Sequence, residues 1–181
     1  MDIKTRATIE DLYKVEGNAE LVHGEIVKMP PAGDEPNVAG GHIFVRLYHY
    51  VQSTGRGRAY TDGAGFSVDL PHRESLSPDA AYHIGIRTGM DFLQGAPIFA
   101  VEVRSKYDYG PAAERAMQEK RDDYFAGGSL VVWDVDLLSE DVVKVYRASD
   151  PSNPTIYRRG DIAEAEPAVP GWRMAVDDLF G

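Results

Sequence analysis

The sequence predicts an α/β fold, with α+β as the alternative, in which a single mixed sheet is flanked by helices. Two segments carry apolar residues at helical spacing, and short runs of β-branched and aromatic residues lie before, between and after them. The predicted order is helix, hairpin, helix, strands, helix, strands. With 181 residues, 43% hydrophobic and 27% charged, the chain is expected to form one domain over residues 1–181.

The first elements are expected to be a short helix and a hairpin. Thr8 and Asp11 have the spacing of a capping box, which predicts a helix that ends near Gly17. In "AELVHGEIVKM" two apolar runs flank His23-Gly24, which has the length of a tight two-residue turn, so a strand is predicted on either side. The following segment, "PPAGDEPN", is expected to be a loop.

The middle of the chain is expected to hold a helix and then strands. Between Val38 and Ser53, one apolar face is formed at i, i+3, i+4 and i+7, and Gly55 is expected to end the helix. "GRAYTDGAGFSVDLP" predicts two short strands around a glycine-rich turn, and "SPDAAYHI" predicts a third. "PIFAVEVRS" has an almost unbroken apolar run, which is typical of a buried strand.

The last third is expected to hold a helix, a hairpin and a final strand. "GPAAERAMQEKRDDYFAGG" opens with proline and closes with Gly127-Gly128, as a helix of about four turns should. "LVVWDVD" and "VVKVYRA" predict a hairpin across "LLSED", "TIYRR" predicts another strand, and "VDDLF" predicts a short helix at the end.

Composition excludes several kinds of site. The chain has no cysteine, so a metal would have to bind oxygen or imidazole ligands. The net charge of −10 argues against a broad electrostatic surface for nucleic acid. No apolar run approaches the length of a membrane span, and the first residues lack the apolar core of a signal peptide, so a cytoplasmic location without membrane contact is expected.

A carboxylate interrupts the most apolar predicted strand. Burying an unpaired charge costs several kcal/mol, so Glu102 needs a partner, a metal ion, or a place at the exposed end of the strand. Asp79 begins another predicted strand, and two carboxylates on adjacent strands can share a divalent cation. Mg²⁺ takes oxygen ligands and keeps several waters, so Asp79, Glu102 and the backbone carbonyl of Val103 would suffice to hold it.

Lys120 lies near the middle of the apolar face of the third predicted helix. At about 100° per residue it shares that face with Ala116, Met117 and Tyr124. A lysine that faces a sheet needs an anion. The sequence therefore predicts that Asp79, Glu102 and Lys120 converge.

The series "SPDA…PIFAVEVRS…KRDDYFAGG…LVVWDVD" resembles the Uma-two family of restriction endonuclease-like proteins, within the PD-(D/E)XK nuclease superfamily. The resemblance implies a restriction endonuclease-like sheet on which Asp79 and Glu102 bind Mg²⁺ or Mn²⁺, while a lysine positions or activates water for phosphodiester hydrolysis. The superfamily's usual lysine, two residues after the glutamate, is replaced here by Arg104, which cannot act as a base at neutral pH. The family tolerates a lysine displaced onto the following helix, and Lys120 fits that role. Arg104 would then clamp a phosphate or form a salt bridge.

Other residues are candidates for auxiliary roles. Glu25 and Glu20 lie in the first predicted hairpin, and each is expected either to point toward the site as an additional metal ligand or to lie on a solvated face, with Glu25 preferred to Glu20 for the ligand role. His42 precedes the apolar face of the second helix and is a candidate for lining the active cleft. The remaining histidines considered are expected in turns or at the surface: His23, His72 and His83.

The leading functional hypothesis is a metal-dependent endonuclease with DNA as its substrate. The net charge and Arg104 favour a rival, a binding or assembly protein that keeps the fold without turnover. A metal-dependent hydrolase of a small phosphodiester is the third possibility. A homodimer is expected, because cutting both strands of a duplex needs two sites, and "VVKVYRA" and "TIYRR" offer candidate contact surface.

Overall fold

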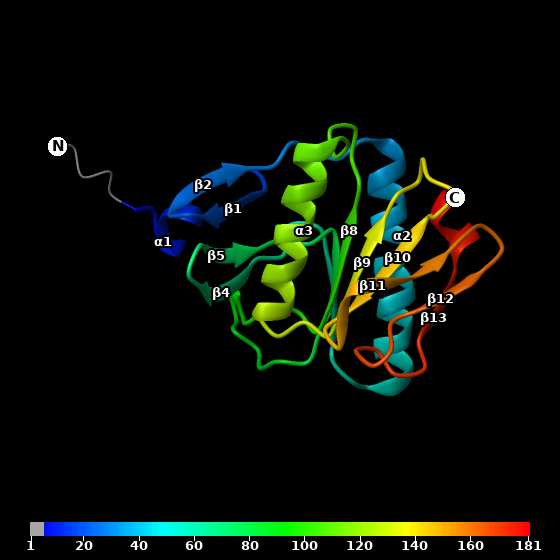
Figure 1. Ribbon diagram of the computed structural model, residues 1–181. Helices are drawn as coiled ribbons and strands as arrows, with labels where there is room; N and C mark the ends of the chain where they lie inside the picture. Colours follow the sequence, from blue (N-terminus) through cyan, green and yellow to red (C-terminus); the bar gives the residue numbers. More distant parts are fainter. Residues whose placement is uncertain (1–5) are drawn as a thin grey trace.

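The computed structural model describes residues 6–181, and its centre is a six-stranded sheet with the order β11–β10–β9–β8–β6–β3 (Figure 1). The strands are β3 (Arg58–Thr61), β6 (Ala80–His83), β8 (Phe99–Val103), β9 (Val131–Val135), β10 (Val143–Arg147) and β11 (Asp150–Tyr157). β8 and β9 pair in parallel, because helix α3 (Pro111–Ala126) carries the chain between them. The other neighbours pair antiparallel, so the sheet is mixed, as predicted.

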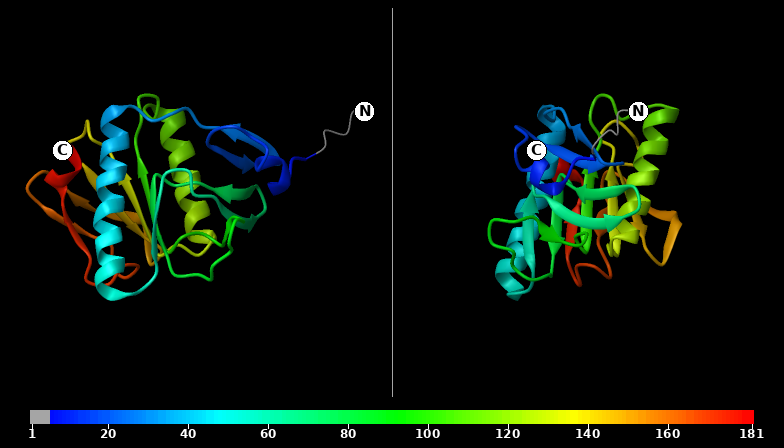
Figure 2. Two further views of the ribbon diagram at one scale, coloured as in Figure 1. Left: turned by 180° about the vertical axis from the view of Figure 1, so that it is seen from behind. Right: turned by 90° about the vertical axis from the view of Figure 1, so that its left-hand side faces the viewer.

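Two helices cover opposite faces of this sheet (Figures 1 and 2). Helix α2 (Asp34–Thr54) packs Ile43 and Leu47 into a core that also contains alternate residues of β8, including Val101. Helix α3 packs Tyr124 into a second core with Ala100 of the same strand. Because side chains alternate along a strand, Glu102 shares the α3 face with Ala100. No helix within residues 6–181 has the length and apolar character needed to cross a bilayer.

A second, five-stranded sheet lies to one side of α3, with the order β2–β1–β5–β4–β7 (Figure 1). Its strands are β1 (Ala19–Val22), β2 (Glu25–Lys28), β4 (Phe66–Leu70), β5 (Arg73–Leu76) and β7 (Leu93–Gln94), and α1 (Ile9–Leu12) precedes it. The turn between β1 and β2 has positive φ at both His23 and Gly24, as a tight two-residue hairpin requires.

The C-terminal segment closes the α2 face. It forms a small antiparallel sheet, β12 (Ile162–Glu164) with β13 (Arg173–Ala175), and the 3₁₀ helix η1 (Val176–Phe180). Trp172 stacks near Trp133 of the central sheet, with ring centroids 5.2 Å apart. The two faces of the central sheet are thus unequal. The α2 face is a closed apolar core, whereas the α3 face carries polar groups.

Several predicted elements are confirmed. They include the capping box of Thr8 and Asp11, the first hairpin, the third helix and the antiparallel pairing of β9 with β10. The second helix is longer than predicted, because it begins at Asp34 inside the segment expected to be a loop. Proline is tolerated in a first helical turn and acidic residues are favourable there, so Asp34, Glu35 and Pro36 suit a helix start. The first helix is shorter than predicted and ends at Leu12.

The single predicted sheet is replaced by two large sheets and a small one. The two strands expected around the glycine-rich turn do not pair with each other, since β3 joins β6 whereas β4 joins β5 and β7. Strand β5 was not predicted because it begins with polar residues, of which Arg73 is buried by its ion pairs to Glu20 and Asp123. Strands β7, β12 and β13 are two or three residues long and carry too little pattern to be recognised.

His83 is buried rather than at the surface, and neither of its ring nitrogens has a hydrogen-bond partner among residues 6–181. Replacing His83 with leucine is expected to raise the free energy of unfolding by about 1–2 kcal/mol at pH 8, because the desolvation penalty of the ring disappears. Burial lowers the pKa of His83 below its ordinary value of 6.5, so the wild type loses further stability as the pH falls below 6.5. Urea unfolding at pH 8 and pH 5.5 measures both effects.

The exposed His49→Leu variant is the matched control for this substitution and should leave the free energy of unfolding nearly unchanged. A His83→Leu effect of the same size at both pH values would contradict the pKa argument.

Candidate functional site

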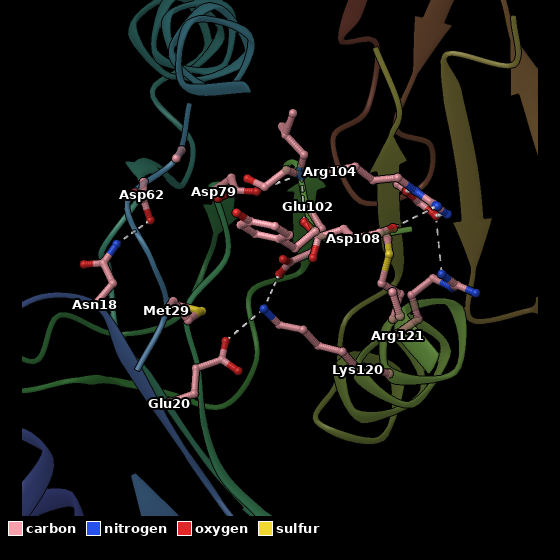
Figure 3. A pocket seen from close by; sticks show the side chains of 18 of the residues that line it. Asn18, Glu20, Met29, Asp62, Asp79, Glu102, Arg104, Asp108, Lys120 and Arg121 are labelled. Carbon is pink, nitrogen blue, oxygen red and sulfur yellow. Dashed lines mark hydrogen bonds and ion pairs between the residues drawn. The ribbon is translucent and has the colours of Figure 1, made fainter. Parts of the chain in front are cut away.

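A cavity of about 390 Å³ opens on the α3 face, between α3 and the β1–β2 hairpin (Figure 3). Asp79, Glu102 and Lys120 all line it, so the structure brings together the three side chains that the sequence predicts to converge. Glu20 faces Lys120 from the hairpin side. Apolar residues form another part of the cavity lining. They come from the hairpin, from the segment directly after it and from α3: Val27, Met29, Pro30, Ala113, Ala116 and Met117.

Strand pairing places the two carboxylates together. Ala80 of β6 lies opposite Val101 of β8, and the N–H of Asp79 donates to the carbonyl of Val101 at 3.0 Å. Asp79 and Glu102 therefore meet at the same end of an antiparallel pair, where opposed side chains point to the same face. The N–H of Val103 donates to Asp79 Oδ2 at 2.6 Å, which leaves Oδ1 for another ligand.

The acid–base properties of this pair favour a bound cation. Burial, together with the charge of Glu102, raises the pKa of Asp79 to about 7. Burial also raises the pKa of Glu102, and the charge of Glu20 adds to that effect. The positive charge of Lys120 opposes both shifts, and a bound cation would favour the ionised carboxylates further.

The donor set is small. Within residues 6–181 no group of three or more His, Cys, Asp and Glu side chains is arranged to hold a metal. Two carboxylates and the backbone of Val103 are nevertheless the oxygen ligands that Mg²⁺ accepts when waters complete its coordination.

Lys120 and Tyr124 fix Glu102 from helix α3. The ammonium of Lys120 lies 2.9 Å from Glu102 Oε1 and 2.9 Å from Glu20 Oε1. The hydroxyl of Tyr124, one helical turn further on, donates to Glu102 Oε1 at 2.5 Å. Although burial opposes it, the charges of Glu102 and Glu20 raise the pKa of Lys120, so its side chain remains an ammonium ion at neutral pH. In the described structure, then, the buried charge of Glu102 is paired with a lysine and hydrogen-bonded to a tyrosine.

Glu20, and not Glu25, is the hairpin residue at the site. Glu20 is buried and accepts from Arg73 Nη1 at 2.6 Å and from the N–H of Ser77 at 2.9 Å. Glu25 is exposed near the turn and does not line the cavity, so the preference for Glu25 was wrong. The sequence pattern does not indicate which glutamate reaches the site, because both lie on the same face of the β1–β2 hairpin. The two differ in their burial, which depends on the surrounding structure.

Arg104 is a structural arginine rather than a phosphate clamp. Its guanidinium donates to both oxygens of Asp134, to both oxygens of Glu114 and to the carbonyl of Asp108. These contacts use all five N–H groups that an arginine has. Of the two roles left open by the sequence, the geometry supports the salt bridge, which ties α3 to strands β8 and β9.

Replacing Arg104 with lysine is therefore expected to lower the free energy of unfolding by about 2–4 kcal/mol without raising phosphodiester cleavage. A lysine ammonium cannot reproduce two bidentate pairs, and Asp134 is almost fully buried. Urea unfolding and a cleavage assay measure the two quantities. Arg115→Lys, on the exposed side of α3, is the matched control. A rise in activity would show that a lysine two residues after Glu102 can still serve the reaction.

His42 does not line the cleft. Its Nδ1 lies 2.7 Å from the carbonyl oxygen of Asp178, so it connects α2 to the C-terminal 3₁₀ helix. This interaction places His42 on the side of α2 that faces the end of the chain, away from Asp79. The expectation that His42 lines the active cleft was wrong because helical position alone does not specify which neighbour a polar side chain meets.

Comparisons with known proteins agree with this architecture. A family model described as "Uma2: Putative restriction endonuclease" matches residues 7–177. Among solved structures, the chain is similar to a "putative nuclease belonging to DUF820 from Anabaena variabilis ATCC 29413", with a TM-score of 0.74, 17% identity and coverage of 96% of this chain and 97% of that chain. At this identity the similarity supports the fold alone. No curated protein matches the chain.

Proposed function

The chain belongs to the Uma2 family, described as "Putative restriction endonuclease", and we propose that it is a metal-dependent endonuclease that hydrolyses DNA phosphodiester bonds. The observation that carries this proposal is the meeting of Asp79, Glu102 and Lys120 in one cavity. Two carboxylates beside a buried ammonium suit a reaction in which negative charge grows on a phosphate.

Asp79, Glu102 and the backbone carbonyl of Val103 would hold Mg²⁺ or Mn²⁺. Their fit rests on the meeting of the two carboxyl groups in one cavity at the same end of the β6–β8 pair, where Asp79 is held by the N–H of Val103 through Oδ2. A bound cation would supply Lewis-acid polarisation of the phosphate oxygens and acidify water at neutral pH.

The chain's own residues orient and balance charge in this proposal. Lys120, kept as an ammonium by its two carboxylate partners, stabilises negative charge on the phosphate and does not act as the base. Tyr124 holds Glu102 in one orientation through its hydroxyl. Arg73 and Ser77 hold Glu20, which in turn positions Lys120.

The test is cleavage of supercoiled plasmid by the wild type and the Glu102→Ala variant, with Mg²⁺, with Mn²⁺ and with a chelator. We expect cleavage that needs the metal and falls at least about a hundredfold in the variant. Glu119→Ala, on the exposed side of the same helix, is the matched control and should cut like the wild type. Equal cleavage by Glu102→Ala, with or without metal, would contradict the proposal.

A hydrolase of small phosphodiesters is the second candidate, and the charge of the site favours it. Each of the four cationic residues lining the described cavity is already paired with a carboxylate: Arg73, Lys120, Arg104 and Arg121. Hydrolysis of bis(p-nitrophenyl) phosphate with intact plasmid would favour this candidate. Activity on neither substrate would favour a binding or assembly protein with the same fold.

We further propose a homodimer that uses β11. Strand β10 lies between β9 and β11, whereas β11 is an edge strand with mostly exposed residues, so of the two candidate segments it is the one with an open edge. Sedimentation should give a species of twice the 20.0 kDa chain mass, and Ile156→Lys should shift it toward the monomer. A wild type found wholly as monomer would contradict this expectation.

A further inference from the structure

A second cavity, of about 210 Å³, lies beside Asp79 and is lined by the first half of α2. Asp79, Asp62 and Ala32 line both cavities, so both cavities adjoin Asp79. A phosphodiester has two groups esterified to one phosphate. If the phosphate lay at Asp79 and Glu102, one cavity would be available for each of these two groups.

Two consecutive glycines of α2 line the smaller cavity. A methyl group added at Gly41 would meet no atom within 4 Å, and one added at Gly40 would lie 3.6 Å from the carbonyl oxygen of Asp79. Glycine inside a helix is less stable than alanine, so neither position is explained by helix stability. At Gly40 the missing side chain lets α2 lie close to Asp79, and at Gly41 it leaves open space in the smaller cavity.

The larger cavity has an aromatic residue at its rim. Tyr107 lines this cavity, yet its side chain is 78% exposed. The ammonium of Lys106 lies 5.8 Å from the centroid of its ring. An exposed aromatic face beside a cation is the arrangement on which unpaired nucleobases stack, while the apolar wall of α3 and the hairpin continues inward from it.

Charge argues against an intact duplex as the preferred substrate. Binding a duplex depends on neutralising many phosphates with lysine and arginine, whereas every cation that lines either described cavity is paired with a carboxylate. Bases within a duplex are stacked and paired, and they reach an enclosed site only when they are unstacked.

We propose that the two cavities bind the nucleosides on either side of one phosphate held at Asp79 and Glu102, so that a single, unpaired strand is a better substrate than duplex DNA. Tyr107 stacks on the base that enters the larger cavity, and Gly41 leaves room for the nucleoside in the smaller one. This inference rests on the proposed phosphodiesterase function and specifies its substrate.

The test compares three substrates in Mn²⁺: a labelled single-stranded oligonucleotide, the same oligonucleotide annealed to its complement, and methyl p-nitrophenyl phosphate, which has one small substituent. We expect the single strand to be cut at least about tenfold faster than the duplex. In Gly41→Leu and in Tyr107→Ala, the ratio of the oligonucleotide rate to the methyl p-nitrophenyl phosphate rate should fall about tenfold. Val45→Leu, on the exposed side of α2, and Leu138→Ala, as exposed as Tyr107, are matched controls whose ratios should not change.

Equal cleavage of single strand and duplex, or unchanged ratios in both variants, would overturn this inference while leaving the phosphodiesterase proposal intact. If the wild type cuts no substrate, the proposed function fails. The two binding cavities can then still be tested by measuring the binding of the labelled strand by fluorescence anisotropy in Ca²⁺. Tenfold weaker binding in Tyr107→Ala and Gly41→Leu would support the two binding cavities. Wild-type binding in both variants would overturn them.

Discussion

Replacing Lys120 with methionine is expected to lower the free energy of unfolding by about 3 kcal/mol and to reduce phosphodiester cleavage at least about a hundredfold. The ammonium of Lys120 lies 2.9 Å from a carboxylate oxygen of Glu20 and 2.9 Å from one of Glu102. Methionine has a similar length but no charge, so it would leave the buried carboxylate of Glu20 and the partly buried carboxylate of Glu102 without the ammonium that they share. Urea unfolding and the plasmid assay measure the two effects.

Three further variants separate the charge of Lys120 from its packing. Lys120→Arg keeps the charge and should retain most of the stability, while Gln118→Met, on the exposed side of α3, should change neither quantity. Adding Glu20→Gln to Lys120→Met removes one of the facing carboxylates and should restore part of the lost stability, which a double-mutant cycle would measure. Wild-type stability of Lys120→Met would mean that the ammonium does not balance these two carboxylates.

The core of the candidate site could be predicted because two of its residues conflict with their surroundings. Glu102 is a charge within an apolar strand, and Lys120 is a charge on the apolar face of a helix. Such conflicts involve only neighbouring residues, so they can be recognised from the sequence alone. Glu20 has no such contrast, since its burial depends on Arg73 and Ser77, which lie more than fifty residues further along the chain.

The difference between local patterns and distant contacts also explains which parts of the fold could be predicted. Helices α2 and α3 have a periodic apolar face over many residues, so their existence and approximate bounds follow from the sequence. The choice of partner for a short strand depends on distant segments. For this reason the sequence predicts strands at β3 and β4 but does not predict that the chain passes from one sheet to the other between them. Arg104 is a similar case, because its two alternatives are resolved by the positions of Glu114 and Asp134 in space.

Replacing Asp79 with asparagine is expected to weaken Mg²⁺ and Mn²⁺ binding and abolish cleavage, and yet to raise the melting temperature of the metal-free protein at pH 8. Asparagine keeps an oxygen that can accept the hydrogen bond from the N–H of Val103, and it removes a charge beside Glu102. Because burial and Glu102 raise the pKa of Asp79 from 3.8 to about 7, this carboxyl lowers the stability of the folded protein progressively as the pH rises from about 4 to 7, and the full loss is present at pH 8. The gain in stability should therefore be larger at pH 8 than at pH 5.

Calorimetric titration with Mn²⁺, together with melting of both proteins with and without Mn²⁺, tests this expectation. Added Mn²⁺ should stabilise the wild type and have little effect on the variant, because a ligand that binds only the folded state stabilises it by an amount that grows with the logarithm of its affinity. Asp69→Asn, at an exposed position of β4, is the matched control and should retain the response to Mn²⁺. If Asp79→Asn instead kept its affinity for Mn²⁺ and melted at a lower temperature, the carboxylate would be a structural acceptor for Val103. The metal site would then have to be abandoned in favour of a binding or assembly protein.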